Sequence, residues 1–171
     1  FKYIACSSKI GISYSKAQNF ELIGYSDADY ASCKIDRKST SGTCQFLGNK
    51  LISWSSKKQN CVALSTVEAV YVSIGNCCAQ MLWIKQQLND YGLNLKNIPI
   101  KCDNTSAISL TKNPVQHSRS KHIEIRHHFI RDHVNNGNIC IEYVPIENQF
   151  FDIFTNLSKN WFSMGTYSMQ I

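Results

Sequence analysis

The stretch FELIGYSDADY, residues 20–30, is an alternating apolar run that ends in two carboxylates. Alternation of this kind predicts a β-strand whose last residues bring Asp27 and Asp29 to the end of a sheet. Ligands collect at such ends in sheets flanked by helices, because the strand fixes a side chain that the following loop leaves accessible. The letters SDAD are also ordinary turn formers, so this stretch alone leaves a turn and a functional site both open.

Outward from this strand, the pattern predicts further strands and helices in a mixed order. A polar loop covers 30–42, and two short alternating segments joined by Gly48-Asn49 form a hairpin. A helical period then runs from Ser65 to the stop signal at Tyr91-Gly92. The predicted segments are strands at 43–47, 51–55, 98–102 and 139–144 and helices at 106–110, 118–134 and 148–157.

Strands and helices in this order predict an α/β (α+β) fold with a five-stranded mixed sheet flanked by helices. The chain has 171 residues and 43% hydrophobic content, which is enough for one sizeable core. We therefore expect one main domain over 20–157, a lead-in over 1–19 and a tail over 158–171. Eighteen Lys and Arg against twelve Asp and Glu give a formal charge of +6, for which a polyanionic partner, with nucleic acid as the first candidate, and an ordinary solvated surface are equally good explanations.

Eight cysteines and five histidines raise the question of disulfides and zinc. The cysteines are scattered through apolar contexts without a Cys-x-x-Cys pair, so we expect small buried thiols in a reducing compartment rather than a structural zinc site. The histidines are expected to pack or to face nucleic acid. No run approaches the roughly 18 apolar residues of a membrane span, and no signal peptide is recognisable. We expect a soluble intracellular protein with no membrane partner.

Four acids fall at the beginnings or ends of predicted segments: Asp27, Glu68, Asp103 and Asp152. Four converging carboxylates cannot remain ionised together without a cation, because each negative charge raises the pKa of the others. Oxygen ligands suit Mg2+, and two such ions ~3.5 to 4 Å apart activate a water and stabilise the leaving oxygen of a phosphodiester. The four acids therefore predict a magnesium-dependent phosphodiesterase site.

Each acid also has a structural alternative that the sequence leaves open. Glu68 completes a capping box with Ser65, in which its carboxylate reaches the Ser65 amide. Asp103 is placed to cap a helix that begins near Thr105. Asp152 is compatible with a solvated acid on the last predicted helix. Only the joint placement of the four acids makes catalysis as good an explanation as these structural roles.

Four segments carry a resemblance to a known family. They are GYSDADYASCKIDRKSTSG at 24–42, ISWSSKKQNCVALSTVEAVY at 52–71, IKCDNTSAISLTKNPVQHSRSKHIEIRHHFIRDHV at 100–134 and YVPIENQFFDIFTN at 143–156. In this order they resemble the ribonuclease H domain at the end of the polyprotein of copia-type LTR retrotransposons, of the sort abundant in plants. Residues 1–19 resemble the connection that follows the reverse transcriptase domain.

The resemblance implies a ribonuclease H fold and hydrolysis of the RNA strand of RNA–DNA hybrids by two Mg2+ ions, with Mn2+ as a substitute and no small-molecule cofactor. It implies that Asp27 bridges the ions, that Glu68 and Asp103 complete one site, and that Asp152 ligates the second ion. The chain has EAVY where the family usually has EAEY, and FFDIFTN where it usually has LADIFTK. Neither change removes a predicted ligand, but both are compatible with a decayed copy.

The implied partners are an RNA–DNA hybrid and the reverse transcriptase domain of the same polyprotein, in a cytoplasmic particle or in the nucleus. A catalytically silent hybrid-binding remnant is the alternative, and an integrase-type strand transferase is disfavoured because its motifs are absent. Basic, hydroxyl and amide side chains supply candidate contacts to the phosphates and the ribose, although for any single one of them a solvated surface position is the better explanation. The candidate nucleic-acid-binding residues are Arg37, Lys38, Ser39, Thr40, Lys57, Lys58, Asn104, Arg119, Lys121 and Arg126.

Overall fold

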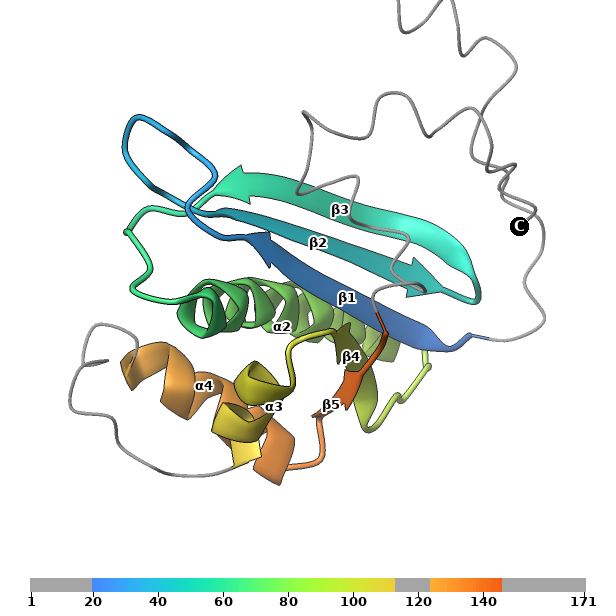
Figure 1. Ribbon diagram of the computed structural model, residues 1–171. Coiled ribbons are helices and arrows are strands. Elements are labelled where there is room, and N and C mark those ends of the chain that lie inside the picture. Colours follow the sequence, from blue (N-terminus) through green and yellow to red (C-terminus); the bar gives the residue numbers. More distant parts are fainter. Residues whose placement is uncertain (1–19, 113–123, 146–171) are drawn as a thin grey trace, which may run out of the picture.

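The computed structural model describes residues 20–112 and 124–145 (Figure 1). Within these residues the chain forms one five-stranded sheet in the order β3-β2-β1-β4-β5 together with three helices. The strands are β1 (Leu22–Asp29), β2 (Thr40–Leu47), β3 (Lys50–Lys58), β4 (Ile98–Cys102) and β5 (Ile139–Tyr143), and the helices are α2 (Thr66–Asp90), α3 (Thr105–Lys112) and α4 (Glu124–Asn135). The predicted five-stranded mixed sheet is confirmed.

The sheet combines three antiparallel strands with two strands that pair in parallel. Strands β1, β2 and β3 are antiparallel neighbours, whereas β1 pairs with β4, and β4 with β5, in parallel. Pairing of β1 with β2 continues to Asp29 opposite Thr40, so β2 begins inside the predicted loop 30–42. Asp27 pairs with Gly42 of β2, so it lies within β1 and not after the strand as predicted. The predicted helix 148–157 lies outside the described residues.

Helix α2 packs directly against β1, because Gly24 leaves room for it. A Cβ atom at Gly24 would lie 3.0 Å from both Cys77 Sγ and Met81 Sδ. The Ser73 hydroxyl donates a hydrogen bond of 2.7 Å to the carbonyl of Asp27 and thereby ties the helix to the end of the strand. Helix packing therefore fixes the strand end that carries the first predicted ligand.

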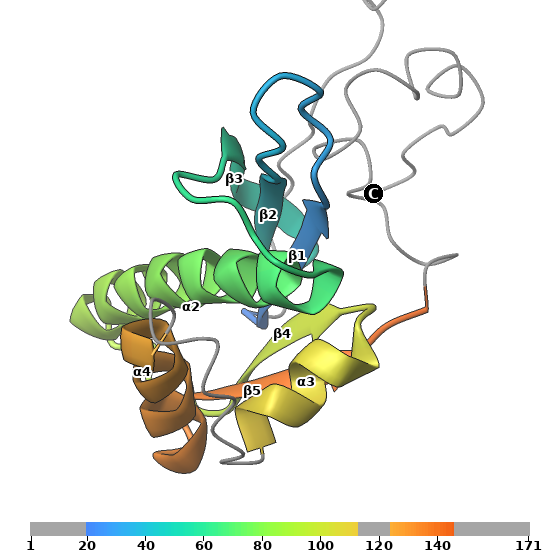
Figure 2. The ribbon, with the colours of Figure 1, turned by 60° about the vertical axis from the view of Figure 1, so that its left-hand side comes forward.

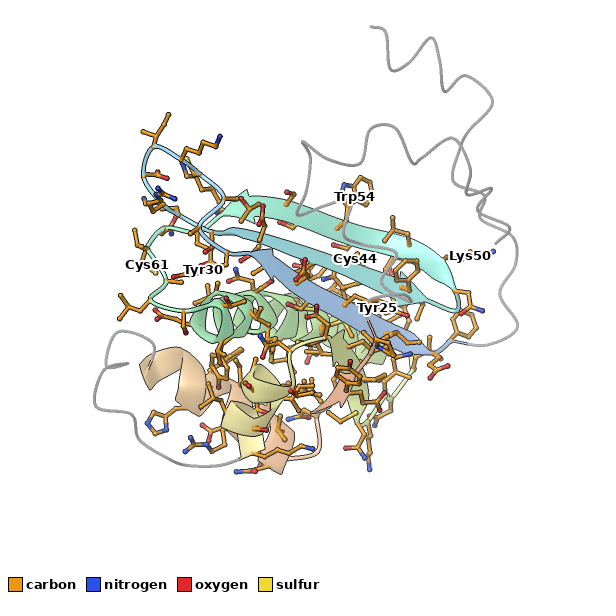
Figure 3. The ribbon with its side chains drawn as sticks, in the orientation of Figure 1. Tyr25, Tyr30, Cys44, Lys50, Trp54 and Cys61 are labelled. Atoms are coloured by element: carbon orange, nitrogen blue, oxygen red, sulfur yellow. The ribbon has the colours of Figure 1, made fainter. Side chains whose placement is uncertain are left out.

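The helices α2, α3 and α4 lie on one face of the sheet (Figures 1 and 2). Inward-facing residues of β1, β4 and β5, such as Leu22, Ile100 and Ile139, join the apolar side chains of these helices in two buried clusters. The register partners Tyr25, Cys44 and Trp54 occupy the opposite face, away from α2 (Figure 3). The apolar core therefore lies between the helices and strands β1, β4 and β5.

By length and composition alone, α2 is also apolar enough to cross a membrane, with a mean hydropathy of 1.2 over its most apolar window. Inside the protein, 67% of that window is buried. A buried core helix passes the same test, so packing against β1 and β4 accounts for its composition.

The cysteines follow the predicted pattern only in part. All seven in the described residues are free, and Cys44, Cys77, Cys78 and Cys102 are buried as expected. Cys61 is exposed, which corrects the expectation for that residue (Figure 3).

Candidate active site

Two of the predicted ligands, Asp27 and Asp103, meet at the ends of neighbouring parallel strands. The register of β1 and β4 places Gly24 opposite Ile100 and Tyr25 opposite Lys101. Continued for two residues, it places Asp27 beside Asp103. Both side chains line one pocket of about 370 Å³. The sheet thus brings together two carboxylates that are 76 positions apart in the sequence (103 minus 27).

The pocket also includes the first residues of two helices, Thr66 of α2 and Thr105 of α3. A helix N-terminus carries a partial positive charge and unpaired amide groups, so it favours carboxylates and phosphate nearby. The remaining walls are Ala28, Val70 and Asn104. An anionic substrate that approaches the two aspartates would therefore meet partial positive charge at the edges of the pocket.

The carboxylates of Asp27 and Asp103 also act on the thiol of Cys102, the last residue of β4. Burial, with smaller contributions from the negative charges of Asp103 and Asp27, raises the pKa of Cys102 to about 12, against the opposing effect of the hydrogen bond from the Asn104 amide. The thiol is therefore neutral near pH 7 and is a packing group beside the pocket.

Glu68 is nearly buried, with 9% of its surface exposed, and takes part in capping α2. The Ser65 hydroxyl accepts a hydrogen bond from the Glu68 amide at 3.2 Å, as a capping box requires. The Glu68 carboxylate accepts a hydrogen bond from the Leu64 amide at 2.8 Å. Glu68 lies in the first turn of α2, between the pocket-lining residues Thr66 and Val70 in sequence, and is not itself among the residues that line the pocket.

Asp103 is not the cap of α3, which corrects that structural alternative. The cap is Asn104, whose side-chain oxygen accepts from the Ala107 amide at 2.9 Å and whose carbonyl accepts from Ile108 at 3.0 Å. Asn104 was a predicted contact to nucleic acid, and the structure gives it this capping role as well. Asn104 also lines the pocket, so its contact to nucleic acid stays a prediction.

The predicted basic and hydroxyl contacts differ in their accessibility. Arg37 and Lys57 are exposed, and Lys38 and Thr40 are partly exposed. Ser39 is fully buried, and its hydroxyl accepts a hydrogen bond of 3.1 Å from the Ala31 amide. This burial excludes the predicted contact from Ser39 to nucleic acid.

Lys58 forms an ion pair with Asp36 at 2.7 Å, and its ammonium lies 3.1 Å from Cys33 Sγ. The hydrogen bond from Lys58 is the main cause that holds the pKa of Asp36 well below its usual range. Lys58 therefore offers less positive charge to a phosphate than the sequence suggests, whereas Lys57 has no such ion pair within the described residues.

Several predicted site residues fall outside the described part of the chain. These are Asp152, Arg119 and Lys121, together with the side chain of Arg126 in α4. Within residues 20–112 and 124–145, no three His, Cys, Asp or Glu side chains form a group that could hold a metal ion. Of the four predicted ligands, the structure brings Asp27 and Asp103 into one pocket and places Glu68 beside its helical wall.

Sequence reasoning missed the contribution of Thr66 and Thr105 to the pocket. The signal for Thr66 was its position directly after the predicted capping residue Ser65, and the signal for Thr105 was the predicted start of a helix near it. It also missed that β2 turns a polar face toward α2. The alternation of Ser41, Thr43 and Gln45 could have shown this, had the strand been predicted to begin before Thr43.

The sequence matches no family model. It is 43% identical over 163 residues to the retrovirus-related Pol polyprotein from transposon RE1 of Arabidopsis thaliana, which covers 94% of this chain and 11% of that protein. The corresponding polyprotein from transposon TNT 1-94 of Nicotiana tabacum is 39% identical over 136 residues, which covers 80% of this chain and 10% of that protein. The chain thus spans about a tenth of the length of these relatives.

Solved structures with the same arrangement include LC11-RNase H1 isolated from compost, at a TM-score of 0.60 and 13% identity, with 80% of this chain and 94% of that one covered. A foamy viral protease-reverse transcriptase in complex with dsDNA matches at a TM-score of 0.57 and 13% identity, with 85% of this chain and 28% of that one covered. Identity this low shows the fold alone. The chain therefore has a ribonuclease H-like fold and is homologous to a segment of the retrovirus-related Pol polyproteins of copia-type plant transposons.

Proposed function

We propose that this chain is a ribonuclease H that hydrolyses the RNA strand of RNA–DNA hybrids during reverse transcription of a retrotransposon. The observation that carries the proposal is the pocket shared by Asp27 and Asp103 at adjacent strand ends of a ribonuclease H-like fold. LC11-RNase H1, which has this fold, has a solved structure in complex with RNA/DNA hybrid. The homologous polyproteins are retrovirus-related, which supports the same substrate class.

The residues present fit a divalent cation by their donor chemistry. Asp27 and Asp103 offer hard carboxylate oxygens in one pocket, which suit Mg2+ or Mn2+. Glu68 and Asp152 are the further proposed ligands. When bound, such ions supply an activated water and stabilise the leaving oxygen of the phosphodiester.

The chain's own residues would bind and orient the substrate around this pocket. The N-termini of α2 and α3, at Thr66 and Thr105, favour the negative charge of a phosphate at the pocket edge. The Leu64 amide holds the Glu68 carboxylate at the start of α2, so its orientation is set by the backbone. The side chains of Lys57 and Arg37 are exposed, so they are available to phosphates of the bound nucleic acid that lie farther from the pocket.

A catalytically silent hybrid-binding remnant is the second candidate. It is favoured by two departures from the usual residues of the family, EAVY at 68–71 and FFDIFTN at 150–156. The two candidates differ in turnover and agree in binding, so a cleavage assay separates them.

The test is cleavage of an end-labelled RNA–DNA hybrid by the purified chain, with Mg2+, with chelator and with the variant Asp103→Asn. The matched control is Asp90→Asn, the same change at an exposed position at the end of α2. We expect cleavage of the RNA strand alone, a loss of at least about 100-fold in Asp103→Asn, and wild-type activity in Asp90→Asn.

Equal activity in Asp103→Asn and the wild type would overturn the proposed site. Salt-sensitive binding of the hybrid without any cleavage would favour the silent remnant. Cleavage of both strands, or of double-stranded DNA, would contradict the proposed substrate class.

A further inference from the structure

Three polar side chains form a cluster where the loop between β1 and β2 meets the end of β3. Cys33 and Asp36 belong to this loop, residues 30–39, and Lys58 is the last residue of β3. The Lys58 ammonium lies 3.1 Å from Cys33 Sγ and 2.7 Å from Asp36 Oδ2. We call these three residues the Cys33 cluster. None of them is among the residues that line the candidate active site.

The backbone around Cys33 adds hydrogen-bond donors to this cluster. Cys33 directly precedes a turn at 34–36, and its carbonyl accepts a hydrogen bond of 2.8 Å from the Arg37 amide. The amides of Asp36 and Ile35 act as donors to the Cys33 sulfur. Amide groups at the start of a turn stabilise a negative sulfur in the same way as those of a helix N-terminus. The sulfur therefore has donors from both the turn and β3.

These donors favour the ionised form of the thiol. The hydrogen bond from the Asp36 amide is the largest cause that lowers the pKa of Cys33. Hydrogen bonds from Lys58 and from the Ile35 amide lower this pKa as well, whereas the Asp36 side chain and burial oppose the shift without reversing it. The thiolate is the nucleophilic form of cysteine, so Cys33 has more of the reactive form at neutral pH than an ordinary thiol.

The other cysteines of the described residues lack this combination of access and charge. Burial raises the pKa of four of them, namely Cys44, Cys77, Cys78 and Cys102. Cys140 is partly exposed, but its thiol donates to the Asn97 carbonyl at 3.3 Å, and burial is the main cause that raises its pKa. Cys61 is exposed. Within 20–112 and 124–145, the only hydrogen bond from a cationic side chain to a cysteine is the one from Lys58 to Cys33.

We propose that Cys33 is an oxidation site, at which the thiolate held by Lys58 and the turn reacts with hydrogen peroxide. The sulfur attacks one oxygen of the peroxide, so that an S–O bond forms while the O–O bond breaks. Cys33 becomes a sulfenic acid, and the hydroxide that leaves takes up a proton from the solvent. The sulfur loses two electrons and the peroxide gains them. The change is reversible, because a small thiol converts a sulfenic acid to a disulfide that a reductant cleaves.

Lys58 is the positioning residue of this site. Hydrogen bonds to Asp36 and, second, to Cys33 raise the pKa of Lys58, so its ammonium stays charged at neutral pH. The charged groups that act on the thiol are thus Lys58 of β3 and Asp36 of the loop. A neutral side chain at position 58 would remove a charge-assisted hydrogen bond from the sulfur, so the thiol would ionise less readily.

The first test compares Cys33 with Cys61 in the same reduced chain. The chain is treated with hydrogen peroxide at pH 7 in the presence of dimedone, which traps sulfenic acids, and the labelled peptides are quantified by mass spectrometry. A lower pKa gives more thiolate but a weaker nucleophile, so the two effects partly cancel. We expect Cys33 to be labelled about 3-fold faster than Cys61. Equal or slower labelling of Cys33 would overturn the proposal.

The second test uses Lys58→Met, with Lys50→Met as matched control. Both variants remove one cation from β3, but Lys50 lies at the opposite end of the strand (Figure 3). The eight positions between them (58 minus 50) span roughly 26 Å, well beyond the Debye length of about 8 Å at physiological salt. We expect Lys58→Met to slow the labelling of Cys33 about 3-fold and Lys50→Met to leave it unchanged. Equal rates in the two variants would contradict the proposal, since the cation would then have no part in holding the thiolate.

A pH profile separates activation of the thiol from a distorted loop. The rate at which iodoacetamide alkylates Cys33 rises with the thiolate fraction, so the midpoint of the profile reports the pKa of this thiol. Lys58→Met should move the midpoint to higher pH and leave the rate at full ionisation within about 2-fold of the wild type. An unchanged midpoint with a lower rate at every pH would mean that Lys58 only shapes the loop, and the proposed activation would be wrong.

The oxidation site and the proposed nuclease function can fail separately. The Cys33 cluster shares no residue with the pocket of Asp27 and Asp103, and its tests measure thiol chemistry alone. If Asp103→Asn removes cleavage while Cys33 is labelled no faster than Cys61, only the oxidation site fails. If the chain does not cleave the hybrid while Cys33 is still labelled faster, the oxidation site stands and the nuclease proposal fails.

Discussion

The two flanks of α2 meet the same sheet in different ways. On the side of β1 and β4, the helix packs on Gly24 and Ile100, and apolar side chains fill the interface. On the side of β2 and β3, it faces Ser41, Thr43 and Gln45, and a polar groove remains. The difference shows that one helix can supply the apolar core on one flank and line a polar groove on the other.

The cause lies in the residues that each strand turns toward α2. Strand β4 presents Ile98, Ile100 and Cys102, all buried in the apolar clusters. Strand β2 presents Thr43 and Gln45, which are equally buried but polar. On this flank of α2, hydrogen bonds and backbone pairing therefore take a larger part in holding the outer strands.

The largest effect should come from a core truncation on the apolar flank. Ile100→Ala removes a fully buried side chain of β4 and should lower the free energy of unfolding by about 2–5 kcal/mol. The control is Thr43→Ala on the polar flank, 4% exposed, for which we expect a loss of about 1 kcal/mol. Urea unfolding measures both, and equal losses would remove the distinction between the flanks.

The next largest effect should be a loss of stability at alkaline pH, caused by a buried thiol on the apolar flank. Burial raises the pKa of Cys78 in α2 from 9.0 to about 12. The folded protein therefore keeps the thiol neutral while the unfolded chain ionises it, so the stabilisation is complete below pH 9 and is lost as the pH rises toward 12. The decline in stability between pH 8 and 11, measured by urea unfolding under reducing conditions, should be shallower in Cys78→Ala.

A decline of equal slope in Cys78→Ala and the wild type would contradict this account. The comparison uses slopes because Cys78→Ala also leaves a small cavity, which shifts stability by a constant amount at all pH values.

The apolar flank was the more predictable one from sequence. Alternation in 20–30 and the period from Ser65 predict β1 and α2, since both signals come from apolar residues that pack locally. The beginning of β2 was missed because Thr40 to Gly42 has no apolar residue, and only pairing with β1 makes it a strand. Spacing could not decide between Asp103 and Asn104 as the cap of α3, because both residue types cap helices.

Glu68 allows a smaller test that separates capping from catalysis. Glu68→Gln keeps an oxygen for the Leu64 amide but removes the charge from the start of α2, so the loss of stability should be about 0.3–1 kcal/mol. If Glu68 also serves the Asp27–Asp103 pocket, hybrid cleavage should fall by about 100-fold or more despite this small change. Wild-type cleavage with the same loss of stability would leave Glu68 a structural cap only.

The smallest effect on stability should come from Gln45→Leu on the polar flank. The change removes an unpaired buried acceptor and a weak contact of 3.8 Å from its amide nitrogen to Cys77 Sγ, while it keeps a side chain of similar size. Stability should therefore stay within about 1 kcal/mol of the wild type, or rise slightly. A loss above 2 kcal/mol in urea unfolding would mean that water already satisfies Gln45, and the groove would then be a hydrated part of the core.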